Sequence, residues 1–80
     1  MVNHPNRNWR SRWSVNLEAA TATHVDGWIF KFTPVDGEPG AFDGKCVGQP
    51  VPLLPEHAAQ AARIAREAGE IYIDGRRARH

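Results

Sequence analysis

The chain has 80 residues, a single cysteine and a formal net charge of +1. This length predicts one domain with a thin core, and one cysteine excludes an internal disulfide. The small net charge hides an uneven distribution. Residues 14–75 carry nine acids against four bases, a net charge of −5, whereas the charged residues outside that range are six arginines. Charge segregation of this kind indicates an interaction role.

The hydropathy pattern excludes membrane proteins of the helical class. No apolar run approaches the roughly 20 residues that a membrane-spanning helix needs. Residues 1–14 are polar and lack the apolar stretch of a secretory signal. We therefore expect a cytoplasmic protein with no membrane partner.

Composition along the chain predicts three parts. Residues 1–8 are polar and predict a flexible arm, residues 9–75 a single domain, and residues 76–80 a basic tail. The domain is expected to be of the α+β class. It combines a small antiparallel sheet, made of a β-hairpin and a third strand, with one C-terminal amphipathic helix packed on the aromatic face of the sheet.

Residues 13–33 predict the hairpin. Residues 13–25 alternate in polarity, which predicts one strand with a buried face that begins at Trp13 and ends at Val25. Asp26-Gly27 is the preferred dipeptide of a two-residue type I′ turn, and residues 28–33 alternate again. Such a turn predicts the pairs Val25 with Trp28, Thr23 with Phe30, and Thr21 with Phe32.

Residues 34–54 are expected to contain a loop, a weaker strand and a linker. Two prolines and two glycines lie within residues 34–40, which predicts a loop. Residues 41–47 predict the third strand, with Cys46 as a small apolar filler of the core. Residues 48–52 contain two prolines and predict an extended linker.

The C-terminal part predicts an amphipathic helix that begins at Pro55, because proline suits the first helical position. Gly69 leaves two alternatives for residues 70–74, a continued helix or a further strand, and the helical spacing of Ile71 and Tyr72 favours the helix. The apolar residues that share the expected inward face are Ala58, Ala61, Ala62, Ile64, Ala65, Ala68, Ile71 and Tyr72. The polar residues expected to face solvent are Glu56, Gln60, Arg63, Arg66, Glu67 and Glu70.

The residue types that carry metal or catalytic chemistry form no motif. None of them shows a paired spacing such as C-x-x-C or H-x-x-x-H. Cys46 with His57 has no surrounding motif of a nucleophile and its base. We therefore expect no metal, no cofactor and no catalytic residue, and a protein that is not an enzyme. The residues weighed as ligands are His4, His24, His57, His80 and Cys46.

The strongest cluster of interaction residues is the stretch 8–13, where arginines alternate with two tryptophans. Trp13 continues the apolar face of the first strand and is expected in the core, so Trp9 is the free aromatic. We interpret the chain as a small protein-interaction module. The alternative is a nucleic-acid-binding accessory protein, because arginines contact phosphates and tryptophan stacks on bases. The candidate interaction residues are Trp9, Arg10, Arg12, Arg76, Arg77 and Arg79.

Overall fold

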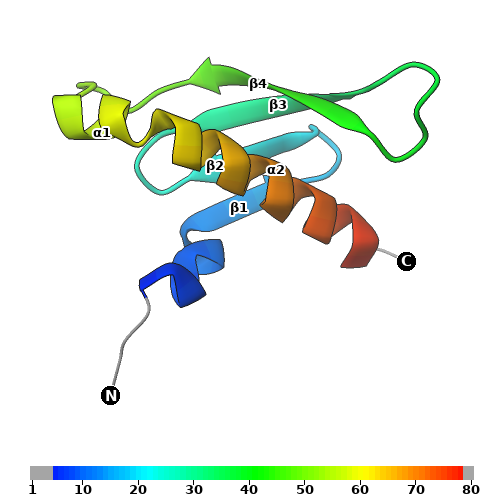
Figure 1. The fold of residues 1–80 in the computed structure, drawn as a ribbon, viewed down its shortest axis with the longest axis horizontal. Coiled ribbons are helices and arrows are strands. Elements are labelled where there is room, and N and C mark those ends of the chain that lie inside the picture. Colours follow the sequence, from blue (N-terminus) through cyan, green and yellow to red (C-terminus); the bar gives the residue numbers. More distant parts are fainter. Residues whose placement is uncertain (1–4, 79–80) are drawn as a thin grey trace.

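The computed structural model describes residues 5–78 and, within residues 5–8, only the backbone. Four antiparallel strands form one sheet in chain order, and α2 crosses one face of it (Figure 1). The α+β class is confirmed, with four strands where two or three were predicted. The elements are η1 (Pro5–Arg12), β1 (Trp13–Asn16), β2 (Thr21–His24), β3 (Ile29–Pro34), β4 (Phe42–Gly48), α1 (Pro55–Ala59) and α2 (Ala61–Ala78).

The predicted strand over residues 13–25 is wrong, because a tight turn divides it into β1 and β2. The side-chain oxygen Oδ1 of Asn16 accepts a 3.0 Å hydrogen bond from the backbone N–H of Ala19, and Ala20 adopts a left-handed φ of 58°. Trp13 pairs with His24 across this hairpin. The turn changes which residues face the helix, so Ala22 and His24 are buried and Thr23 between them is exposed.

The β2–β3 hairpin exists, but its predicted register is wrong by one residue. Ala22 pairs with Phe30, where Thr23 was expected. The N–H of Gly27 donates to the carbonyl of His24 (2.9 Å), and the N–H of His24 donates to the carbonyl of Trp28 (2.7 Å). The loop therefore has three residues, 25–27. It ends at Gly27 with φ of 114°, as in three-residue hairpins whose last residue has positive φ.

The third predicted strand is confirmed as β4, which forms one edge of the sheet. Phe32 of β3 pairs with Gly44, and Phe30 pairs with Cys46. Cys46 is nevertheless exposed, so its expected role as a core filler is wrong. The reason is its place on the edge strand, close to the point where the chain leaves the sheet for α1 (Figure 1).

The prediction of a single helix from Pro55 is wrong, because the helix is interrupted at Gln60, which divides it into α1 and α2. The helical alternative for residues 70–74 is confirmed, and α2 continues beyond Gly75 to Ala78. Arg76 and Arg77 are therefore helical, and residues 5–8 of the predicted arm belong to η1. The predicted inward face is rotated. Ala65 is exposed, whereas Glu67, expected in solvent, is buried. The predicted burial of Ile64, Ala68 and Tyr72 against the sheet is confirmed.

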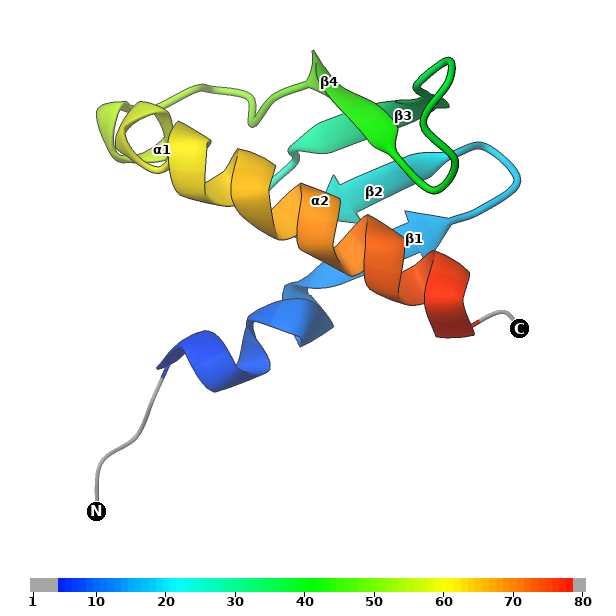
Figure 2. The same cartoon turned by 45° about the vertical axis from the view of Figure 1, so that its right-hand side comes forward.

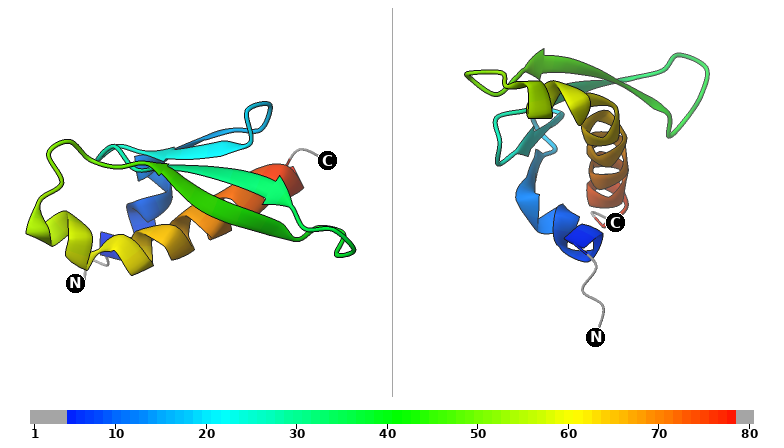
Figure 3. Two further views of the ribbon diagram at one scale, coloured as in Figure 1. Left: turned by 90° about the horizontal axis from the view of Figure 1, so that it is seen from above. Right: turned by 60° about the vertical axis from the view of Figure 1, so that its left-hand side comes forward.

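The core lies between the sheet and α2, which Figure 2 and the two further views in Figure 3 show as two layers. The predicted burial of Trp13 is confirmed, and the aromatic face of the sheet meets the helix as expected. Phe32 stacks on Tyr72, with 4.3 Å between the ring centroids. The buried apolar residues are Trp13, Ala22, Trp28, Phe30, Phe32, Ile64, Ala68 and Tyr72.

Candidate functional site

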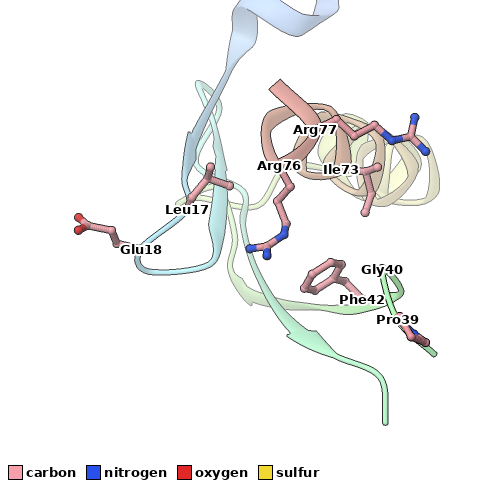
Figure 4. A pocket seen from close by; sticks show the side chains of 8 residues that line it. All are labelled: Leu17, Glu18, Pro39, Gly40, Phe42, Ile73, Arg76 and Arg77. Carbon is pink, nitrogen blue, oxygen red and sulfur yellow. The ribbon is translucent and has the colours of Figure 1, made fainter. Parts of the chain in front are cut away.

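A large cleft lies at the C-terminal end of α2. Its volume is about 760 Å³, and it is bounded by the last turns of α2, the turn after β1 and the loop before β4 (Figure 4). Leu17, Phe42 and Ile73 give it apolar walls. The remaining lining residues are Glu18, Pro39, Gly40, Arg76 and Arg77. We call this space the Arg76 cleft.

Arg76 is held in position by two aromatic rings. Its guanidinium carbon lies 4.7 Å from the Phe42 ring centroid and 6.0 Å from that of Tyr72. Its Nη1 donates a 3.5 Å hydrogen bond to the hydroxyl of Tyr72. Tyr72 is itself buried in the core, so the cation rests on a fixed surface. In Figure 4 the side chain of Arg76 points toward Phe42, and that of Arg77 points away from it.

A second, smaller cleft of about 260 Å³ lies at the other end of the sheet, between β2 and the first turns of α2. It is polar, and its chemistry is set by two buried ionisable side chains, His24 and Glu67. The residues that line it are Trp9, Arg12, His24, Asp26, Gln60, Arg63 and Glu67.

The buried polar groups of this second cleft have partners. Glu67 accepts hydrogen bonds from the indole Nε1 of Trp13 (3.1 Å) and from Nη1 of Arg63 (3.0 Å). Nδ1 of His24 accepts a 3.1 Å hydrogen bond from the backbone N–H of Asp26. Burial lowers the pKa of His24, and the neighbouring Asp26 carboxylate opposes that shift. A neutral imidazole is therefore favoured at this position.

The candidate residues of the N-terminal segment do not lie in the Arg76 cleft. The guanidinium of Arg10 binds the carboxylate of Asp74 at 3.0 Å and stacks on the ring of Trp9 at 4.4 Å. Trp9 is half-buried against the core and, with Arg12, lines the polar cleft. Arg79 lies outside the described residues. The structure thus brings Arg76 and Arg77 together and separates them from Trp9 and Arg12.

An exposed apolar segment was missed by the sequence reasoning. Four large apolar residues between the middle of β4 and the start of α1 are exposed: Val47 by 55%, Val51 by 95%, Leu53 by 44% and Leu54 by 42%. The sequence signal was available, because aliphatic residues alternate there with prolines. We interpreted the stretch as a linker and assigned no role to its side chains.

Within residues 5–78, no three side chains of the types His, Cys, Asp or Glu are grouped so that they could hold a metal ion. None of the helices described is both long and apolar enough to cross a bilayer. Comparison of the chain with protein-family models, with curated proteins and with solved structures finds no match.

Proposed function

We propose that this chain is a non-enzymatic protein-interaction module that binds its partner through the apolar segment of residues 47–54. The observation that carries this proposal is the exposure of Val47, Val51, Leu53 and Leu54 within eight consecutive residues. Exposed apolar side chains gathered in one place are typical of protein contact surfaces. Their burial would contribute about 25 cal/mol for each Å² of apolar surface removed from water.

The position of the segment supports a protein partner. Val47 belongs to β4, an edge strand whose outer backbone groups have no neighbouring strand in the sheet. Edge strands pair readily with another chain, and the apolar segment follows directly after this one. Lys45 lies on the same strand, and an edge lysine opposes indiscriminate pairing. A partner would therefore need a complementary edge and an apolar surface beside it.

The nucleic-acid alternative is supported less well by the distribution of charge. Two of the described arginines, Arg10 and Arg63, are in ion pairs with Asp74 and Glu67. The whole chain carries ten bases against nine acids, a net charge of only +1. Binding to a polyanion depends on cations that are free to displace its counterions. Protein partners therefore stay our first choice.

The experiment compares two valine variants of the full chain in affinity capture from the native cell. Val51→Asp places a charge in the apolar segment, and Val25→Asp places the same charge at a 66% exposed valine of the β2–β3 loop, outside residues 47–54. We expect Val51→Asp to lose the captured protein and Val25→Asp to keep it, with equal unfolding midpoints. Equal capture by both variants would exclude this surface. Capture of a nucleic acid that weakens steeply with salt would favour the alternative.

A further inference from the structure

The Arg76 cleft combines apolar walls with the oriented cation of Arg76, and none of its lining residues belongs to the apolar segment of residues 47–54. Leu17, Phe42 and Ile73 come from three different parts of the chain and give it apolar walls. A volume of about 760 Å³ falls within the range of small-molecule sites, which is about 300–1,000 Å³. A ligand with an apolar body would therefore find room and matching walls there.

Within the part of the chain that the structure describes, the cation at this cleft has no negatively charged partner. Among residues 5–78, no carboxylate lies within ion-pair distance of Arg76, in contrast to Arg10 and Arg63. Glu18 lines the cleft, yet its side chain points away from Arg76 (Figure 4). The hydrogen bond to the Tyr72 hydroxyl uses one N–H of the guanidinium and leaves other N–H donors available.

We propose that the Arg76 cleft binds a carboxylate carried on an apolar group. A guanidinium presents parallel N–H donors that match the two oxygens of a carboxylate. Its contacts with Phe42 and Tyr72 fix its orientation in advance, which lowers the cost of binding. A phosphate dianion is matched less well, because Arg77 points away from Arg76 (Figure 4).

Two sources share this ligand chemistry: the C-terminal residue of a peptide that ends in an apolar side chain, and a small apolar carboxylic acid. The probe is N-acetyl-phenylalanine, titrated into the isotope-labelled full chain and followed by NMR chemical shifts. We expect saturable shifts at Phe42, Ile73 and Arg76. The matched control is N-acetyl-phenylalanine amide, which keeps the ring and removes the charge, and we expect it to bind at least tenfold more weakly.

Two arginine variants test the role of the cation. Arg76→Gln removes the charge in the cleft, whereas Arg66→Gln removes an exposed charge of the same helix that does not line the cleft. We expect Arg76→Gln to weaken binding of N-acetyl-phenylalanine at least tenfold and Arg66→Gln to leave it unchanged. Equal binding of acid and amide, or unchanged binding by Arg76→Gln, would overturn the proposal.

Two further probes distinguish the sources once the acid binds. Tighter binding of a decapeptide with a free C-terminal phenylalanine than of N-acetyl-phenylalanine identifies a peptide terminus. Equal or tighter binding of hexanoate identifies a small acid, and both results support the carboxylate site. Val51→Asp should retain the binding of N-acetyl-phenylalanine, so a failure of the proposed protein contact is distinguishable from a failure of this site.

Discussion

The indole Nε1 of Trp13 donates a 3.1 Å hydrogen bond to Oε1 of Glu67, and the two residues are each only 7% exposed. This contact joins the first strand to the middle of α2. The second carboxylate oxygen of Glu67 accepts from Arg63, one helical turn earlier. Both oxygens are therefore occupied, which is why an acid is tolerated on the inward side of the helix.

Replacing Glu67 tests the importance of this contact. Glu67→Ala leaves the Trp13 N–H buried without an acceptor, and hydrogen bonds to charged groups contribute about 1.5–3 kcal/mol. We expect the free energy of unfolding to fall by about 2 kcal/mol in urea denaturation. Glu67→Gln should lower the free energy of unfolding less than Glu67→Ala does, because an amide oxygen still accepts the indole N–H. The ion pair that it removes contributes little, since the Arg63 side chain is half-exposed.

The control for Glu67 is Glu70→Ala on the same helix, because Glu70 is exposed. Its substitution should change stability by no more than about 0.5 kcal/mol. Equal costs at the two positions would mean that Glu67 does not lie against Trp13.

A pair of alanines tests the orientation of α2. Ala68 is fully buried against the sheet and Ala65 is exposed. Ala68→Leu should overpack the interface, at a typical cost of about 1–3 kcal/mol. Ala65→Leu adds the same atoms on the solvent side and should be close to neutral. Thermal or urea unfolding measures both. The sequence alone predicted both alanines on the inward face, so similar losses at the two positions would contradict the orientation seen in the structure.

Gly27 tests the three-residue loop between β2 and β3. Its φ of 114° is rare for residues with a side chain, and an added Cβ would lie 3.1 Å from the backbone Cα of Pro50. Gly27→Val should therefore destabilise the fold by about 1 kcal/mol or more. Gly37 also has positive φ, with no atom within 4 Å of an added Cβ. Gly37→Val should cost less, so an equal or greater loss there would mean that the contact with Pro50 is unimportant.

The elements with a strong local signal could be predicted from the sequence. Pro55 predicts that a helix begins there, and α1 does begin at Pro55. The alternating aromatic residues predict the strand β3 of the hairpin. The turn at residues 17–20 carries no glycine or proline, and its conformation depends on the Asn16 side chain and on Ala20 with positive φ. The alternating pattern continues across this turn without a break, so it does not indicate that the strand ends there. This is why the buried and exposed residues of β2 were predicted the wrong way round.

The rotation of α2 and the Arg76 cleft depend on contacts between residues far apart in the sequence. A helical wheel groups Glu67 with the polar residues and so predicts that it faces solvent. Its burial depends in part on the indole of Trp13, 54 residues earlier, which no helical wheel includes. Arg76 and Arg77 were identified as interaction candidates from charge alone. Sequence could not show that Phe42 and Tyr72 would hold Arg76 at a cleft, because Phe42 belongs to a different element.

His24 predicts how stability depends on pH. Burial against Trp13, whose ring centroid is 4.8 Å away, lowers the pKa of His24 below its ordinary value of about 6.5. The charges around it act in both directions: Asp26 and Glu67 raise this pKa, whereas Arg12 and Arg63 lower it. Because the net shift is downward, the unfolded chain takes up a proton on His24 at a higher pH than the folded chain does.

The sign follows from this difference in proton uptake. The contribution of neutral His24 is fully present above about pH 6.5 and is lost progressively as the pH falls toward the lowered pKa of the folded state. We expect a smaller free energy of unfolding at about pH 5 than at about pH 7.5. In His24→Gln the difference between these two values should shrink, because that variant lacks the His24 contribution. Parallel pH profiles for the two proteins would mean that the folded state does not favour neutral His24.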